Sequence, residues 1–306
     1  MRISVVIPTQ RRTAGLETAA RSILGQTGAP FADLELVIVD NDKTPSAQPM
    51  AAALAAEAPF PVVYVHEPEP GVANARNAAL EQARGEFIAF LDDDEEAPAG
   101  WLAALLAAQA RFDADVVFGP VRGRAPAEVT RHRDYLETFF SRQGPPEAGL
   151  IDHYYGCGDS LLRRAALPDP KRPFSAVRNH IGGEDDLLFG QMKANGARFA
   201  WAPEAWVWED PVPARLSLGY TIRRAFAYGQ GPSAACAAAD PPDRLGLAFW
   251  MGQGLVQAGV FGLLAGLKWL IRAPDFAFTL DRAARGLGKT LWWGPFKIEF
   301  YGRSAA

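Results

Sequence analysis

Short apolar runs alternate with helix-like segments over residues 1–120. The apolar runs lie at residues 3–7, 34–39, 62–65, 87–91 and 116–118. Segments with a helical pattern separate them, at residues 15–26, 46–58, 72–84 and 99–111. Because strands that alternate with helices form a mostly parallel sheet with helices on its faces, we predict an α/β fold.

Polar residues follow four of the predicted strands. They are Pro8-Thr9, Asp40-Asn41-Asp42, Glu67 and Asp92-Asp93-Asp94. Ligands of open α/β sheets bind outside the carboxyl ends of the strands, so we expect these residues to border a binding site. No glycine-rich dinucleotide loop and no P-loop follows the first strand, which argues against those two classes of nucleotide site.

The pattern changes near the C-terminus, where residues 245–267 carry no charged side chain. As a helix, this stretch would be about 35 Å long, enough to cross a bilayer. Its six glycines, together with Gln253 and Gln257, make it a poor membrane span. Three alternatives stay open: a true span, a helical hairpin in the membrane interface, and a buried helix that closes an acceptor site.

Charge divides the chain at about the same place. Residues 1–212 carry 20 Lys and Arg against 30 Asp and Glu, whereas residues 213–306 carry 11 against 5. The formal net charge of −4 gives no reason to expect a nucleic-acid partner. Aromatic and basic side chains mix after residue 267, which favours contact with an anionic membrane surface. The N-terminus shows no signal-peptide pattern, so we expect the protein to face the cytoplasm.

The acidic run from Asp92 to Glu96 directly follows an apolar strand. Five neighbouring acids repel one another unless a cation lies among them. A site rich in carboxylate oxygens suits Mg²⁺ or Mn²⁺, which would also bind diphosphate oxygens and stabilise a leaving nucleoside diphosphate. The alternative is a solvated acidic turn without a ligand.

Several segments in a fixed order resemble family 2 inverting glycosyltransferases of the GT-A fold. They are SVVIPT at residues 4–9, LVIVDND at 36–42, GVANARN at 71–77, GEFIAFLDDD at 85–94 and GEDDL at 183–187. The resemblance covers residues 1–212 and implies a single Rossmann-like, mostly parallel sheet flanked by helices, followed by a helical C-terminal extension. Residues 209–231 resemble the tail of a bacterial exopolysaccharide subgroup, the succinoglycan-type transferases.

The resemblance assigns roles to the residues that bind the donor. Pro8, Thr9 and Asp40 would hold the nucleobase, and Arg76 would approach the nucleotide. The acidic triplet would supply the D-x-D motif and complete the donor-binding set. Within it, Asp94 would bind Mn²⁺ or Mg²⁺, Asp92 would bind the ribose or the metal, and Asp93 is the middle residue, whose share of these roles is open.

The resemblance also supplies a general base. Inverting transfer needs a group that deprotonates the acceptor hydroxyl, and a carboxylate suffices. The family's E-D pair matches Glu184 and Asp185, so Asp185 is the predicted base and Glu184 an acceptor-binding neighbour. The alternative is that these acids only complement the N-terminal dipole of a helix over residues 185–195.

Weaker candidates lie elsewhere in the chain. Residues 156–164 match a family segment near the donor sugar and acceptor, but Asp159 stands where the family often has Asn. Cys157 fits a small buried residue better than a nucleophile, because no basic partner is evident. Arg223 and Arg224 could neutralise a diphosphate or lie on a solvated helix face. The four histidines show no metal-ligand spacing: His66, His132, His153 and His180.

These observations favour an inverting, metal-dependent glycosyltransferase. It would move a hexosyl or N-acetylhexosaminyl group from a nucleotide sugar, with UDP favoured, to a polyprenyl-pyrophosphate-linked glycan in bacterial exopolysaccharide synthesis. The alternatives are a nucleotidyltransferase that makes the sugar nucleotide, which would usually open with a basic glycine-rich loop, and a non-catalytic scaffold that binds a nucleotide sugar. Release of nucleoside diphosphate would separate the three.

The predicted domain organisation follows the same division. Residues 1–212 would form the catalytic domain, with a nucleotide-binding half at 1–120 and an acceptor-binding half at 121–212. Residues 213–306 would form a helical, membrane-associating region. The expected location is the cytoplasmic face of the bacterial inner membrane, attached peripherally or weakly inserted.

Overall fold

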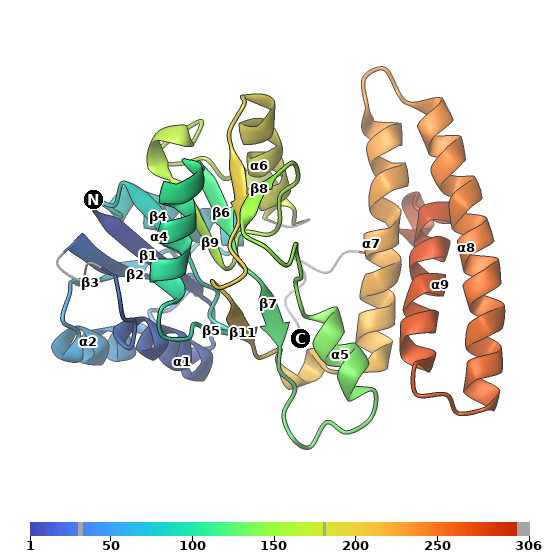
Figure 1. The fold of residues 1–306 in the computed structure, drawn as a ribbon, viewed down its shortest axis with the longest axis horizontal. Coiled ribbons are helices and arrows are strands. Elements are labelled where there is room, and N and C mark those ends of the chain that lie inside the picture. Colours follow the sequence, from blue (N-terminus) through green and yellow to red (C-terminus); the bar gives the residue numbers. More distant parts are fainter. Residues whose placement is uncertain (30–32, 180–181, 299–306) are drawn as a thin grey trace. The chain divides into compact units, whose positions relative to one another are not determined.

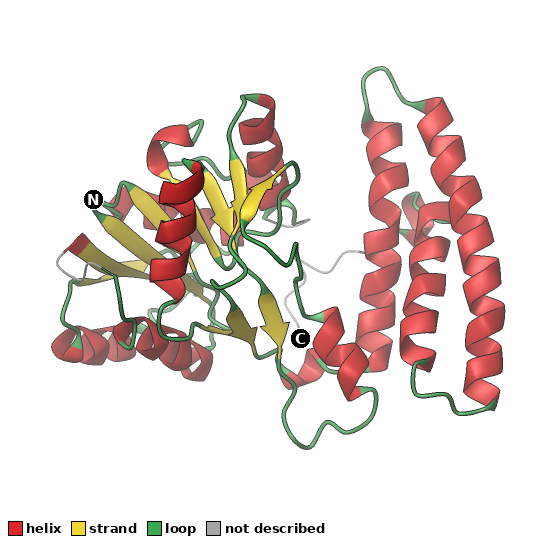
Figure 2. Cartoon of the chain, in the orientation of Figure 1, coloured by secondary structure: helices red, strands yellow, loops and turns green. Residues whose placement is uncertain are grey.

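A computed structural model describes residues 1–29, 33–179 and 182–298 (Figures 1 and 2). The chain divides into two compact units. Unit 1 comprises Met1–Arg122 and Ser141–Asp210, and unit 2 comprises Gly123–Phe140 and Pro211–Ala306. Each unit has its own packing, and each is described by itself.

Unit 1 is built on an eight-stranded sheet. Its strand order is β3 (Val62–His66), β2 (Leu34–Asp40), β1 (Ile3–Thr9), β4 (Phe87–Phe90), β9 (Ser160–Arg163), β6 (Val116–Phe118), β10 (Phe199–Trp201) and β8 (Gly149–Ile151). The five predicted strands are present, and β3, β2, β1 and β4 pair in parallel. Strand β9 lies antiparallel between β4 and β6. The sequence analysis missed it because its four residues carry no alternating pattern of their own.

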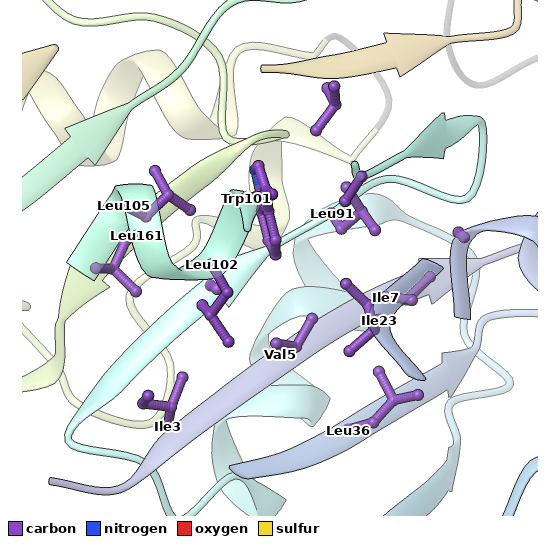
Figure 3. Packing of buried hydrophobic residues seen from close by; sticks show 14 of the residues in the cluster. Ile3, Val5, Ile7, Ile23, Leu36, Leu91, Trp101, Leu102, Leu105 and Leu161 are labelled. Atoms are coloured by element: carbon purple, nitrogen blue, oxygen red, sulfur yellow. The ribbon is translucent and has the colours of Figure 1, made fainter. Parts of the chain in front are cut away.

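Helices cover both faces of this sheet. They are α1 (Thr13–Leu24), α2 (Gln48–Glu57), α3 (Val72–Gln82), α4 (Trp101–Phe112) and α6 (Glu184–Ala194). Alternate residues of β1 point to opposite faces: Ile3, Val5 and Ile7 join the cluster around Trp101 (Figure 3), whereas Val6 joins a second cluster. Burial on both faces explains why β1 and β2 are continuous apolar runs. The four helices predicted before residue 120 and the helix after residue 184 are therefore confirmed.

Short elements complete unit 1. A three-stranded sheet has the order β5 (Glu95–Glu96), β11 (Val207–Glu209) and β7 (Val121–Gly123). The 3₁₀ turns η2 (Arg164–Ala166) and η3 (Ala176–Arg178) lie in connections. Strand β11 pairs antiparallel with β5, and the amide of Asp210 donates to the carbonyl of Asp94 at 2.8 Å. The small sheet thus fixes the backbone that follows the acidic triplet.

Unit 2 is helical. It contains α5 (Arg133–Phe139), α7 (Leu218–Ala238), α8 (Arg244–Leu270) and α9 (Phe276–Thr290), with the turns η4 (Pro213–Arg215) and η5 (Gly294–Phe296). Figure 1 shows α7, α8 and α9 running side by side. Close approach of these helices requires glycine at two contacts. A Cβ at Gly288 would lie 2.0 Å from the carbonyl oxygen of Phe226 on α7, and one at Gly254 would lie 2.6 Å from that of Gly286.

Residues 245–267 lie within α8. This helix has the length and composition of a membrane span, with a mean hydropathy of 1.4 over its most apolar window, yet only 11% of that window is buried. The interpretation as a buried core helix therefore finds no support in unit 2. The span and the interfacial hairpin stay predictions.

Candidate active site

The acidic triplet turns the chain between β4 and β5 at the carboxyl end of the sheet. The hydroxyl of Thr9 donates to Asp93 Oδ2 at 2.8 Å. Arg12, the residue before α1, places Nη1 2.8 Å from Asp93 Oδ1 and 2.7 Å from Asp94 Oδ2. Burial raises the pKa of Asp93 to about 6, against the opposing effects of Arg12 and Thr9. The predicted nucleobase residue Thr9 thus contacts the acidic turn directly.

Asp92 points to a different partner from its two neighbours. Its Oδ1 lies 3.6 Å from Arg76 Nη2, and its side chain is 37% exposed. Desolvation and the nearby charges of Asp94 and Asp185 raise the pKa of Asp92, whereas Arg76 lowers it. A Cβ at Gly158 would lie 2.6 Å from Asp92 Oδ2, so only glycine leaves room for this carboxylate.

Arg76 links the acidic turn to the E-D pair. Its Nη1 lies 2.6 Å from Glu184 Oε1, and both side chains are 6% exposed. The guanidinium also lies over the ring of Phe174, 5.5 Å from its centroid. Burial raises the pKa of Glu184, and the charge of Arg76 opposes that shift. The structure therefore places the predicted nucleotide-contacting Arg76 between Asp92 and Glu184, with little of its own surface exposed.

Asp185 follows Glu184 at the start of α6 but has different hydrogen-bond partners. Gly182 and Gly183 precede this helix with φ of +75° and +77°, a backbone that glycine adopts readily. The amide of Cys157 donates to Asp185 Oδ2 at 3.2 Å, and the amide of Asp186 donates to Oδ1 at 2.9 Å. Both the predicted catalytic role and the alternative, complementing the helix dipole, are compatible with this position. Backbone amides from the loop at residues 156–158 and from the first turn of α6 thus both hold the Asp185 carboxylate in place.

Arg142 was not predicted from the sequence, yet it organises that loop. Its guanidinium donates to the carbonyls of Gly119, Gly156, Gly158 and Asp159, at 2.9, 3.0, 2.9 and 2.8 Å. No local pattern marks Arg142, because its partners are backbone carbonyls from other segments. Cys157, within this loop, is buried, as predicted, and burial raises the pKa of its thiol.

Asp159 is fully buried behind the acidic turn. The indole of Trp101 donates to its Oδ1 at 2.7 Å, and Arg142 Nη2 lies 3.3 Å from its Oδ2. Burial raises the pKa of Asp159 to about 7, with Arg142 opposing the shift. Glu95 lies nearby, and its Oε2 accepts the amide of Asp92 at 2.8 Å. Desolvation and the charges of Asp92 and Asp159 raise the pKa of Glu95 as well. These buried acids support the turn from behind.

Asp40 lies at the end of β2, beside β1. It is buried, and its Oδ2 accepts hydrogen bonds from the amide of Ala47 at 2.6 Å and from the hydroxyl of Tyr64 at 3.0 Å. Pro8 lies on β1, opposite Val39 in the pairing of the two strands. The three predicted nucleobase residues, Pro8, Thr9 and Asp40, thus occupy neighbouring strand ends, as the parallel topology requires.

The carboxylate oxygens of the acidic turn suit a cation that is bound jointly with a diphosphate. Asp92 and Asp94 offer hard oxygen ligands from one turn, and Mg²⁺ commonly takes one or two carboxylates together with substrate phosphates. Over the described residues, no group of three His, Cys, Asp or Glu is arranged to hold a metal by itself. One Asp94 oxygen already accepts from Arg12. Asp92 and Asp94 could therefore supply part of the coordination shell of a cation.

The histidines take no part in this cluster where the structure describes them. His66 lies 2.9 Å from the carbonyl of Asp42, and His153 lies 2.8 Å from the hydroxyl of Tyr155. His132 precedes α5 in unit 2. His180 lies outside the described residues.

Comparisons with known sequences agree with this geometry. The family profile described as Glycosyl transferase family 2 matches residues 4–169. The succinoglycan biosynthesis protein ExoM of Rhizobium meliloti (strain 1021) is 37% identical over 235 residues, which is 75% of this chain and 74% of that protein. A GalNAc(5)-diNAcBac-PP-undecaprenol beta-1,3-glucosyltransferase of Campylobacter jejuni is 32% identical over 106 residues, 34% of this chain and 33% of that protein.

Solved structures share the fold. The mannosyltransferase PcManGT from Pyrobaculum calidifontis, in complex with GDP-Man and Mn²⁺, matches 95% of this chain and 87% of its own, with 21% identity and a TM-score of 0.62. S. aureus TarS 1-349 in complex with UDP-GlcNAc matches 81% of this chain and 70% of its own, with 18% identity and a TM-score of 0.53. The predicted α/β fold of GT-A type, with a helical C-terminal region, is confirmed.

Proposed function

This chain belongs to glycosyl transferase family 2, and from that membership we propose that it transfers a sugar, with inversion, from a UDP-linked donor to a polyprenyl-pyrophosphate-linked glycan. That it is a glycosyltransferase follows from the family. The donor, the acceptor and the stereochemistry are the proposal. Support for the lipid-linked acceptor comes from the Campylobacter relative, which is named for transfer to an undecaprenol-linked glycan. Similarity to ExoM supports a place in exopolysaccharide synthesis.

The observation that carries the proposal is the junction at Arg76. One guanidinium faces Asp92 of the acidic turn and binds Glu184, the neighbour of the candidate base. The carboxylates suited to the cation of the donor diphosphate therefore belong to the same cluster as the carboxylate suited to deprotonate the acceptor hydroxyl. Inverting transfer needs these two groups close together, on either side of the anomeric carbon.

We assign the roles within this cluster as follows. Asp94 and Asp92 would hold Mn²⁺ or Mg²⁺ together with the donor diphosphate, and a cation bound there would stabilise the negative charge of the departing diphosphate. Thr9 and Arg12 keep the turn in place through Asp93. Pro8 and Asp40 border the nucleobase at the ends of β1 and β2.

Asp185 accepts the proton of the attacking hydroxyl. The amides of Cys157 and Asp186 fix both of its oxygens before the acceptor arrives. Glu184 stays paired with Arg76 and keeps this guanidinium in position beside Asp92. One acid thus reacts while the other holds the geometry, which explains why the family motif needs two.

We further propose that three parts of the chain have different functions. Residues 1–120 bind the nucleotide, residues 121–212 bind the acceptor, and residues 213–306 attach the enzyme to the cytoplasmic face of the inner membrane. Support for attachment comes from the exposed apolar helix α8 and from the excess of basic residues after residue 212.

The proposal is tested with purified protein, a panel of nucleotide sugars, Mn²⁺ and an undecaprenyl-pyrophosphate-linked acceptor. We expect release of uridine diphosphate that depends on the acceptor, and a product whose anomeric configuration by NMR is opposite to that of the donor. Retained configuration would refute inversion. Donor binding without any release would favour the scaffold alternative, and formation of a sugar nucleotide from a nucleoside triphosphate would favour the nucleotidyltransferase.

A further inference from the structure

Helix α8 carries an apolar stripe along its whole length. Positions three, four or seven residues apart share one face of a helix. Six such side chains are 56–86% exposed: Leu245, Phe249, Val256, Leu263, Leu267 and Leu270. Near Gly252, the side chains of Phe249, Val256 and Val260 border a shallow, open depression in the stripe. A continuous exposed apolar surface of this kind marks a site of contact with a membrane or with another protein.

The neighbouring helix α9 places cations beside the centre and the N-terminal half of α8. Lys289 Nζ donates to Gln253 Oε1 and Gln257 Oε1 at 2.8 and 2.9 Å. The carbonyl of Arg282 accepts from Gln257 Nε2 at 2.8 Å, and the Arg282 guanidinium lies 5.4 Å from the centroid of Phe261. Near the other end of α8, Lys268 Nζ donates to Thr279 of α9 at 3.0 Å.

Acidic side chains on α9 offset only part of this charge. Asp281 binds Arg285 at 2.6 Å and accepts from Tyr135, and Asp275, just before α9, pairs with Lys268. The cations that flank the stripe at its centre and its N-terminal half are Arg282 and Lys289. A surface with an apolar stripe and a basic edge is complementary to an anionic bilayer.

The position of Arg282 decides how α8 can meet that bilayer. Its contact residue Gln257 is the midpoint of the helix Arg244–Leu270. If α8 crossed the membrane, Arg282 would therefore lie near the centre of the hydrocarbon layer, where a charged side chain is costly. If α8 lies parallel to the surface, all the flanking cations reach the headgroups at once.

We infer that α8 lies in the plane of an anionic phospholipid bilayer, with its apolar stripe in the acyl boundary and Arg282 and Lys289 at the headgroup phosphates. This inference rests on the proposed membrane attachment and specifies its geometry.

Depth measurements test this geometry in the full-length protein. Single cysteines replace Leu245, Val256 or Leu267, and an environment-sensitive fluorophore is attached to each. The background is Cys236→Ser, and the native Cys157 is kept because it is buried and so protected from labelling. Quenching by lipid-borne nitroxides in phosphatidylglycerol–phosphatidylcholine vesicles gives the depth of each label. We expect all three labels at one shallow depth, about 5–10 Å into the headgroup and acyl boundary.

Three outcomes would overturn the inference. A Val256 label much deeper than both end labels would show that α8 spans the bilayer. Labels that stay in water would show that vesicles do not cover the stripe, and a spectral change that depends on protein concentration alone would identify a second copy as its partner. Uridine diphosphate release, assayed on the same samples with a water-soluble acceptor analogue, reports on the proposed chemistry separately, so each can fail without the other.

Charge and apolar contact are tested by matched variants. The double change Arg282→Gln and Lys289→Gln should weaken binding to anionic vesicles roughly thirtyfold at low salt, since each cation near the surface accounts for about fivefold. The exposed pair Lys43→Gln and Lys171→Gln removes the same charge from unit 1 and should change binding little. Leu263→Glu should abolish attachment, whereas Val177→Glu, at an equally exposed apolar position of unit 1, should not. Equal effects of test and control variants would refute the assignment of this surface.

Discussion

Arg76 and Glu184 form a buried ion pair across 108 residues of sequence, with Nη1 2.6 Å from Oε1. The pair joins α3 to the first residue of α6, and Arg76 reaches Asp92 on its other side. The relative position of the acidic turn and the E-D pair therefore depends on one guanidinium.

Arg76→Met should lower the free energy of unfolding by about 3–5 kcal/mol, because it leaves Glu184 as an uncompensated buried charge. The double variant Arg76→Met and Glu184→Leu should recover much of that loss, since no unpaired charge then remains between the two helices. Urea denaturation of the wild type, both single variants and the double variant measures the cycle. Strictly additive effects would show that the two side chains do not interact.

Asp94→Ala should remove the dependence of donor binding on divalent cations while the fold is kept. Arg12 still binds Asp93 in this variant, so the free energy of unfolding should change by no more than about 1 kcal/mol. In the wild type, calorimetry should show much tighter Mn²⁺ binding in the presence of uridine diphosphate, because the protein supplies only part of the coordination shell. Tight Mn²⁺ binding without the nucleotide, or full Mn²⁺-dependent affinity in Asp94→Ala, would contradict the shared site.

Asp185→Asn should keep donor affinity and reduce transfer at least about a hundredfold, because the amide has the same shape but cannot accept the proton. Donor affinity is measured by titration and turnover by release of uridine diphosphate. Asp186→Asn is the control, since Asp186 is exposed on the same turn of α6. Normal turnover in Asp185→Asn would move the general base to another residue.

Gly158→Ala should impair donor binding through steric contact alone. Its Cβ would lie 2.6 Å from Asp92 Oδ2 and 3.0 Å from Glu95 Oε1, so Asp92 must move. We expect weaker Mn²⁺-dependent binding of uridine diphosphate with a melting temperature that changes by a few degrees at most. Gly149→Ala, where the Cβ meets open space, is the matched control. Equal donor affinity in both variants would show that Asp92 need not hold this position.

Asp93→Asn should change how stability depends on pH. Burial raises the pKa of Asp93 from 3.8 to about 6, so the folded protein binds a proton that the unfolded chain has lost between these values. The stabilising contribution of Asp93 is therefore complete below pH 3.8 and is lost as the pH rises through 6. Relative to the wild type, Asp93→Asn should gain up to about 3 kcal/mol of unfolding free energy between pH 4 and pH 7.

Urea titrations across this pH range measure the effect. Asp113→Asn is a control of opposite sign, because its hydrogen bond and ion pair with Arg163 lower the pKa of Asp113. Its contribution is present at neutral pH and is lost as the pH falls, so the variant should lose stability relative to the wild type as the pH rises. An Asp93→Asn difference that is constant with pH would show that Asp93 titrates normally.

The sequence by itself determined the features that depend on local patterns. Apolar runs of strand length alternating with helical segments were enough to predict β1 to β4, β6 and the helices that cover them. The acidic triplet and the E-D pair were recognisable because each is contiguous and directly follows or begins an element. The strand ends then placed the triplet at the carboxyl edge of the sheet.

Tertiary structure alone decided which distant side chains meet. The ion pair of Arg76 with Glu184, the bridge of Arg12 between Asp93 and Asp94, and the contacts of Arg142 with four carbonyls have no local signature. The same holds for α8, whose composition allowed a span, an interfacial hairpin or a buried helix. Its relation to Arg282 on α9 favours the interface, because the cost of a charge depends on where packing places it.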